Sequence, residues 1–133
     1  MDRFLLDGDL SSEVELEAFL EYNGVSFVRE PDGFRFLLTE GGCRWETVCR
    51  FTRRSVIIYG LYPFELTDGI LPTLNAINAK LIRGCMLLNE GGVSVRTSAD
   101  LYDAYGSYEA IARALEYNAG VIVKYWSEIS AFE

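Results

Sequence analysis

The sequence contains no histidine. Histidine is the usual general base near neutral pH, the partner of serine and cysteine nucleophiles, and a common zinc ligand. Its absence argues against an enzyme and a zinc site, so we expect no catalytic, cofactor-binding or metal-binding residues. Cysteine is also scarce: Cys43, Cys49 and Cys85 are an odd set with irregular spacing, which does not predict a disulfide framework. We interpret them as small buried hydrophobic residues.

Basic residues are few, with 12 Lys and Arg against 20 Asp and Glu, so the formal net charge is −8. This charge disfavours nucleic acid and anionic membranes as partners, since both attract a basic face, and it would suit a basic partner. The longest apolar segment, 55–66, falls short of the roughly 20 residues that span a bilayer. The N-terminal MDRFLLDGDL has no basic stretch followed by a long apolar one. We therefore predict no secretory signal and expect a cytoplasmic protein.

Residues that build a core are plentiful, because 50% of the 133 residues are hydrophobic and 14% are aromatic. This length and composition predict a single folded domain, 1–133. The first predicted element is a helix over 11–24, in which Ser12 and Glu15 form a capping box and Gly24 ends the helix. We interpret its evenly spaced glutamates, Glu13, Glu17 and Glu21, as a solvated face rather than as a set of acid–base catalysts.

Three strands are predicted next, joined by short turns. Pro31-Asp32-Gly33 is a turn signal, because Pro fixes φ and Gly accepts a positive φ. Apolar and polar residues then alternate over 34–39 and, after Gly41-Gly42, over 43–52. The third segment, 55–66, is apolar on both faces, which predicts a central or doubly covered strand. Together these strands predict an antiparallel meander.

The segment 71–84, LPTLNAINAKLIRG, predicts a second helix. Its apolar residues recur at spacings of three and four, as in a buried helical face: Leu71, Leu74, Ile77 and Leu81. Pro72 fits the first turn of this helix, and Gly84 ends it. A second hairpin follows, turned at 90–92, and apolar and polar residues alternate over 93–101 in its second strand. A final helix starts at Ser107. This last helix carries an apolar seam: Ile111, Leu115, Asn118, Ile122, Tyr125 and Ile129.

The order of the predicted elements is helix, three strands, helix, two strands, helix. Grouped strands with short hairpins predict an α+β fold, an antiparallel five-stranded sheet with helices packed on it, rather than alternating βαβ units. One face of such a sheet cannot hide three helices without leaving apolar surface outside. We therefore expect a homodimer, most simply an isologous one.

Two segments carry a resemblance to a known family. They are LNAINAKLIRGCMLLNEGGVSVRTSADLY, which contains a Leu-Asn-x-x-Asn pattern and a glycine-containing turn, and SYEAIARALEYNAGVIVKYW, with its late aromatic pair. In these segments the sequence resembles the YbjN-type domain, which is similar in fold to the type III secretion chaperones of the CesT-like class. The resemblance implies a small, acidic, cytoplasmic and dimeric protein. The secretion chaperones hold the N-terminal segment of an effector in a non-globular form, and the YbjN-like branch is linked to stress responses and regulation.

Three asparagines lie among apolar helical residues. Asn75 and Asn78 match the family's helix pair, and Asn118 interrupts the seam of the last helix. A buried amide can satisfy backbone groups at a strand end, or pair across a twofold axis and select one register of helix packing. We predict a structural or dimer-interface role for these residues, together with Ile77 and Leu81. Contact with a ligand is the alternative.

Aromatic residues with polar tips suit a binding surface that is partly wet and partly apolar. Among them, the partner-binding candidates are Tyr59, Tyr62, Phe64 and Trp126. The first functional hypothesis is a non-enzymatic protein-binding domain that holds a client segment along exposed sheet edges and apolar grooves. The alternative is a small-molecule-sensing or regulatory domain with a pocket between helix and sheet. A peptide strand along an edge would favour the first hypothesis, and a closed pocket lined by tyrosines and asparagines the second.

Overall fold

The structure, a computed structural model, describes residues 11–90, 92–103 and 105–133. The expectations about residues 1–10, and Gly91 of the predicted turn, lie outside the described residues. The chain forms one sheet of six antiparallel strands in the order β1-β2-β3-β4-β6-β5. The strands are β1 (Val28–Glu30), β2 (Gly33–Glu40), β3 (Cys43–Phe51), β4 (Ser55–Leu61), β5 (Cys85–Asn89) and β6 (Gly92–Asp100).

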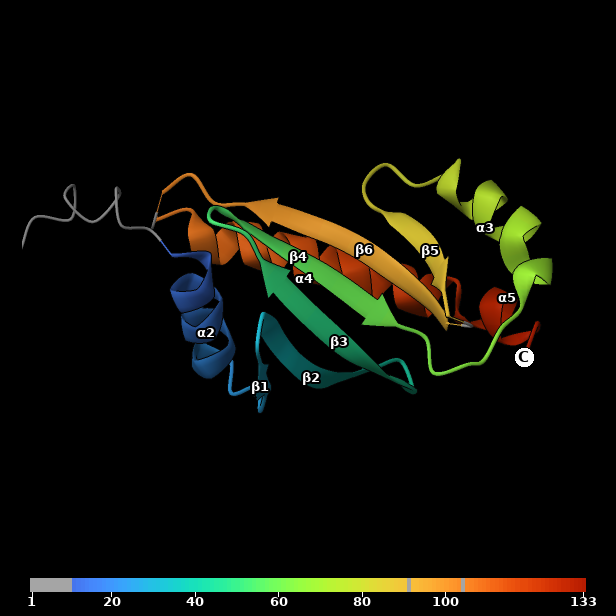
Figure 1. Cartoon of the computed structure of the whole chain (residues 1–133), viewed down its shortest axis with the longest axis horizontal. Helices are drawn as coiled ribbons and strands as arrows, with labels where there is room; N and C mark the ends of the chain where they lie inside the picture. The colour runs from blue at the N-terminus through green and yellow to red at the C-terminus, as the bar shows by residue number, and fades with distance from the viewer. Residues whose placement is uncertain (1–10, 91, 104) are drawn as a thin grey trace, which may run out of the picture.

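Helices pack on one face of the sheet, and no described helix covers the other face (Figure 1). The helical elements are α2 (Ser12–Tyr22), the 3-10 helix η2 (Asp68–Ile70), α3 (Leu71–Asn78), α4 (Ser107–Lys124) and α5 (Trp126–Ser130). In Figure 1, α4 runs behind β4 and β6, α2 lies near its beginning, and α3 and α5 lie near its end. Figure 1 is therefore a view of the open face of the sheet.

The α+β architecture with an antiparallel sheet is confirmed, but the prediction of five strands is wrong. The additional strand is β1, which the predicted turn connects to β2 so that Glu30 lies opposite Gly33. Three residues are too few to show an alternation of apolar and polar side chains, so the sequence pattern did not reveal this strand. The final helix also differs from the prediction, because it breaks at Tyr125 into α4 and α5.

The second helix ends earlier than predicted. α3 ends at Asn78 rather than at Gly84. The apolar spacing continues to Leu81 because this side chain packs against the core from the loop after the helix. Gly84 has a φ of 72°, and a Cβ at this position would lie 2.4 Å from the Arg96 carbonyl oxygen. A glycine is therefore required here for the loop to pass close to β6.

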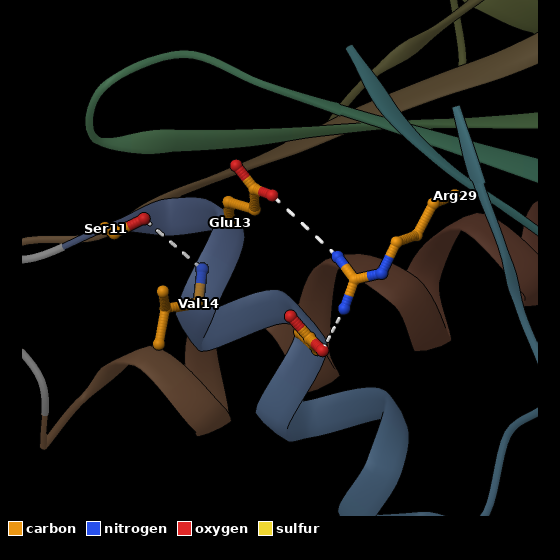
Figure 2. A network of polar contacts seen from close by, with 5 residues as sticks. Ser11, Glu13, Val14 and Arg29 are labelled. Atoms are coloured by element: carbon orange, nitrogen blue, oxygen red, sulfur yellow. Dashed lines mark hydrogen bonds and ion pairs between the residues drawn. The ribbon is translucent and has the colours of Figure 1, made fainter. Parts of the chain in front are cut away.

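The N-terminal cap of α2 is Ser11, so the predicted capping box of Ser12 and Glu15 is wrong. Ser11 Oγ accepts a hydrogen bond from the Val14 N–H at 3.3 Å (Figure 2), while the Ser12 hydroxyl donates to the Thr52 carbonyl. Two successive serines were both able to cap, and the sequence did not distinguish them.

The acidic face of α2 is partly neutralised by Arg29 of β1. Arg29 Nη1 lies 3.9 Å from Glu13 Oε2, and the same guanidinium also pairs with Glu17 (Figure 2). Arg29 and Glu13 are about half exposed and Glu17 is partly exposed, so each pair contributes at most about 1 kcal/mol. The arrangement attaches the short strand β1 to α2.

Two apolar clusters fill the space between the helices and the sheet. The cluster beneath α2 and the first half of α4 includes Leu16, Leu20, Phe34, Val56, Ile58 and Ile111. The cluster at the end of α4, beside α3 and α5, includes Trp45, Leu74, Ile77, Val95, Ile122 and Ile129. Alternate residues of β6 are buried in both clusters, as its sequence pattern predicts. Across the described part of the chain, no helix has the length and apolar character needed to cross a membrane.

Candidate functional site

Asn118 lies in the core between α4 and the sheet and is 1% exposed. Its Nδ2 donates to the carbonyl oxygens of Ile58 and Val95, at 3.2 and 2.8 Å, and to Thr97 Oγ1 at 3.1 Å. Thr97 in turn donates to the Ala114 carbonyl at 3.0 Å. Buried N–H groups need acceptors, so this network fixes α4 over β4 and β6. All of these contacts lie within one chain.

Gly60 of β4 lies directly opposite this amide. A Cβ on Gly60 would lie 2.4 Å from Asn118 Oδ1 and 3.1 Å from two side-chain carbons of Ile122. Glycine usually weakens the interior of a strand, but here it allows α4 to approach the sheet closely. The sequence analysis missed Gly60, because the residues that require it come from a distant helix.

Asn78, unlike the buried Asn118, lies at an edge of the sheet, beside the edge strand β5. Its Oδ1 accepts from the Met86 N–H at 2.7 Å, and its Nδ2 donates to the Met86 carbonyl at 3.1 Å. The side-chain amide thus occupies the backbone groups to which a neighbouring strand would otherwise bind. Asn75 is exposed on the same helix. A dimer-interface role for these asparagines stays a prediction.

The two apolar interface candidates differ in exposure. Ile77 is 2% exposed and belongs to the core, whereas Leu81 is half-buried. Leu81 and its neighbour Ile82 line a groove of about 470 Å³ between the loop after α3 and the outer face of α4. Ile82 is 90% exposed, which makes this groove an apolar surface feature.

The four partner-binding candidates are not gathered in one place. Tyr62 is a buried member of the core, and Phe64 and Trp126 pack against it. The ring centroids are 6.1 Å apart for Tyr62 and Phe64 and 5.1 Å apart for Phe64 and Trp126. The Tyr62 hydroxyl donates to the Ile122 carbonyl at 2.8 Å, and burial raises the Tyr62 pKa. Tyr59 lies opposite Val48 on the open face of the sheet, half-buried. Their role in binding stays a prediction.

The three cysteines are free thiols in different environments. Cys49 is buried in the core, as interpreted from the sequence, and burial raises its pKa to about 12. Cys43 and Cys85 are half-buried. The residues that the structure describes include no group of three or more His, Cys, Asp or Glu side chains able to hold a metal ion.

The outer edge of β2 is open over most of its length. β1 pairs with β2 only as far as Arg35, although β2 continues to Glu40 (Figure 1). Glu40 and Cys43 close a two-residue hairpin and therefore point their backbone groups at each other. The direction of the backbone N–H and C=O groups alternates from one residue to the next along a strand. The N–H and C=O groups of Leu37 and Thr39 therefore point away from β3, to a side where no described strand lies.

An apolar groove of about 580 Å³ accompanies this edge. Its walls come from β2 and β3 on one side and from the chain that leads into β1 on the other, over Gly24–Val28. Leu37 is 49% exposed and Val28 is 65% exposed. Arg35 lies beside the groove on the open face, where hydrogen bonds to Glu46 and Glu30 raise its pKa. The sequence analysis anticipated binding at sheet edges but did not identify these residues, because β1 was not predicted.

The described residues define a class of fold: a six-stranded antiparallel sheet with the described helices packed on one face. No protein-family model matches the sequence, and no curated protein matches it. The fold is similar to that of YbjN from E. coli, for which a role as a transcription regulator has been suggested. The TM-score is 0.61 at 15% sequence identity, and the alignment covers 85% of this chain and 90% of that one. The YbjN-like fold is therefore confirmed, whereas the similarity to secretion chaperones stays a prediction.

Proposed function

We propose that this protein binds an extended segment of another polypeptide by strand addition at the outer edge of β2, and that it acts by binding rather than by catalysis. The observation that carries this proposal is the outward direction of the backbone groups of Leu37 and Thr39 beyond the end of the β1 pairing. An added strand would satisfy these groups, and its alternate side chains would provide specificity.

The surroundings of the edge favour a particular client chemistry. The groove is lined mainly by apolar side chains, including Val25, Phe27 and Leu38. Its charged rim is already paired, since Arg35 Nη1 lies 2.5 Å from Glu46 Oε2. A chain with a net charge of −8 repels acidic partners at longer range. We therefore propose an apolar client segment that is neutral or basic.

The substitution Thr39→Pro tests the proposal. Proline removes the outward N–H of this residue without removing a hydrogen bond between β2 and β3, so the fold should persist while strand addition is blocked. The probe is a peptide selected from a phage-displayed random library by the wild-type protein. We expect the substitution to raise its dissociation constant at least about tenfold, measured by fluorescence polarisation.

Thr39→Ala is the matched control, because it removes the same side chain and keeps the N–H. It should bind the selected peptide as the wild type does, and both variants should unfold at similar temperatures. Failure to enrich any peptide, or equal binding by Thr39→Pro and Thr39→Ala, would contradict the proposal.

A role in regulation, as suggested for YbjN, is compatible with this activity when the partner is a protein. The net charge of −8 opposes direct contact with DNA phosphates. We further propose that the protein works in the cytoplasm, a compartment in which its three thiols would stay reduced.

We also propose that the chain forms a homodimer through the groove between α4 and the loop after α3. This surface carries both an exposed apolar side chain, Ile82, and an apolar groove lined by Leu81 and Val121. It also carries charges of both signs, on Lys124 and Glu116. An isologous interface requires such a self-complementary surface, because the same residues face each other across the twofold axis.

Ile82→Glu should convert the dimer into a monomer, because it would place two carboxylates in an apolar interface. Sedimentation velocity over a range of concentrations should show the dimer dissociation constant rising more than about tenfold. Val14→Glu, at a 58% exposed apolar position on α2, is the control and should leave the dimer unchanged. A wild-type chain that sediments as a monomer at all concentrations would show that this proposal is wrong.

A further inference from the structure

The central strand β4 presents apolar side chains to both faces of the sheet. Val56 and Ile58 are buried in the core beneath the helices, so Ile57, Tyr59 and Leu61, which alternate with them, point to the open face. These three side chains are half-buried, although no described helix covers them (Figure 1). A hollow of about 560 Å³ lies over this part of the sheet, and we call it the open-face hollow.

The strand register gathers the lining of the open-face hollow into one block. Tyr59 lies opposite Val48, and Leu61 lies opposite Ser94. Side chains of residues that lie directly opposite each other share one face of the sheet, with Cβ atoms about 4.5–5.5 Å apart. Arg35 lies opposite Val48 on its other side and belongs to the same row. The residues of this face that line the hollow are Arg35, Val48, Arg50, Tyr59, Leu61 and Ser94.

Ser94 supplies a hydroxyl group that the described part of the chain does not use. The residue is 7% exposed, and among the described residues its hydroxyl has no hydrogen-bond partner. Thr97 points to the helices from the same strand and shows the usual arrangement, because its hydroxyl donates to the Ala114 carbonyl. The Tyr59 hydroxyl is also unpaired within the described residues. Because buried polar groups are normally hydrogen-bonded, an unpaired hydroxyl that lines a hollow favours a bound ligand.

The rest of the lining combines apolar surface with polar groups. Val48 is 5% exposed and forms an apolar floor together with Leu61 and the Tyr59 ring. Asn89 and Glu90, at the end of β5 and directly after it, also line the hollow and are exposed. A ligand in the hollow therefore meets apolar carbon on the sheet and an amide, a carboxylate and hydroxyl groups around it.

The charges around the hollow favour neither an anion nor a cation. Arg35 already lies beside two carboxylates, and Arg50 pairs with Asp32. Glu90 adds a negative charge, and the whole chain has a net charge of −8, so an anion gains little. A cation would face both arginines. This balance favours a neutral polar ligand.

We propose that the open-face hollow binds a neutral sugar or cyclic polyol. Such a ring has an apolar C–H face that can pack on the Tyr59 ring and Val48. Its hydroxyl groups both donate and accept hydrogen bonds, so they can pair with the hydroxyls of Ser94 and Tyr59 and with the Asn89 amide. A purely apolar ligand would leave the Ser94 hydroxyl without a partner. The volume of about 560 Å³ is within the range for small-molecule sites.

This site goes beyond strand addition, because it lies on a face of the sheet rather than at its edge. Of the residues that line the open-face hollow, only Arg35 also lines the groove beside β2. Sugar binding can therefore be tested independently of the client segment, and failure of one proposal leaves the other standing.

Saturation-transfer NMR on the full chain tests the site, because it detects weak binding of small molecules. The probes are glucose, galactose, mannose and myo-inositol, with cyclohexanecarboxylate as an anionic ring and cyclohexanol as a ring with a single hydroxyl. We expect at least one polyhydroxylated probe to bind more tightly than both comparison rings, and its backbone amide shift changes should centre on Val48, Tyr59 and Ser94. Binding of none of the four polyhydroxylated probes, tighter binding of a comparison ring, or shift changes centred elsewhere would overturn the proposal.

Ser94→Ala should raise the dissociation constant of that probe at least about fivefold, since one hydrogen bond is lost. Because the hydroxyl has no partner among the described residues, the variant should unfold at the wild-type temperature in the absence of the probe. Ser98→Ala is the matched control, at an exposed serine on the same strand and face but outside the hollow, and it should change neither quantity. Equal affinity of the two variants, or a lower unfolding temperature of Ser94→Ala alone, would show that the Ser94 hydroxyl does not serve a ligand.

Discussion

Asn118→Asp should lower the free energy of unfolding by about 3–5 kcal/mol at neutral pH. Aspartate has nearly the shape of asparagine, so the substitution leaves no cavity. It replaces the buried donor with a carboxylate that faces the carbonyl oxygens of Ile58 and Val95. Those oxygens now lose a donor and repel the new charge, which has no cation beside it in the core.

The loss of stability caused by Asn118→Asp should be larger at neutral pH than at acidic pH. Burial and the facing carbonyl oxygens would raise the pKa of the introduced carboxyl above its ordinary value of about 3.9. The folded state would then bind a proton more tightly than the unfolded state, so stability falls as pH rises above the unfolded pKa. Urea denaturation at acidic and neutral pH should therefore show a smaller difference from the wild type at the acidic end.

Asn75→Asp is the matched control for this prediction. Asn75 is exposed on α3, so the same exchange should change stability by no more than about 0.5 kcal/mol. Similar losses at positions 75 and 118, or a loss at position 118 that does not vary with pH, would be incompatible with a buried donor network.

Gly60→Ala should also be strongly destabilising, by about 2–4 kcal/mol. The new methyl group would lie 2.4 Å from Asn118 Oδ1, so either the amide leaves its acceptors or α4 moves away from the sheet. Alanine would normally suit a strand interior better than glycine, and a destabilising effect therefore reports this close approach. Chemical denaturation of the wild type and variant measures it.

Gly120→Ala is a control that should change the stability in the opposite direction. Gly120 lies on α4, and nothing would lie within 4 Å of a Cβ there, so alanine should stabilise the protein by about 0.5–1 kcal/mol. A double variant, Gly60→Ala with Asn118→Ala, should lose less stability than the sum of the two single variants, because the clashing oxygen is absent. If the losses of stability of the two single variants add up in the double variant, the contact with Asn118 Oδ1 is not the cause of the Gly60→Ala effect.

Patterns that depend on neighbouring residues along the chain predicted most of the fold. The alternation over 93–101 identified β6 (Gly92–Asp100) and its buried face correctly. Gly41-Gly42 identified the hairpin between β2 and β3, and both residues have positive φ. These features are local consequences of strand geometry and turn sterics, so one sequence is enough to reveal them.

The candidate sites depend on strand order and register, which a local pattern does not contain. The open edge at Leu37 and Thr39 exists because β1 is three residues long and its pairing with β2 reaches only to Arg35. The asparagines were identified as unusual core residues, but only the structure distinguishes the buried amide of Asn118 from the edge amide of Asn78.

The amide of Asn78 has a consequence for assembly in concentrated solution. A chain with one free edge at β2 and another at β5 could polymerise head to tail, each copy extending the sheet of the next without a closing symmetry. Because Asn78 already occupies both backbone groups of Met86, β5 offers an incomplete template to the β2 edge of another copy. One side chain thus allows the β2 edge to stay open while continuous fibres of the protein itself are disfavoured.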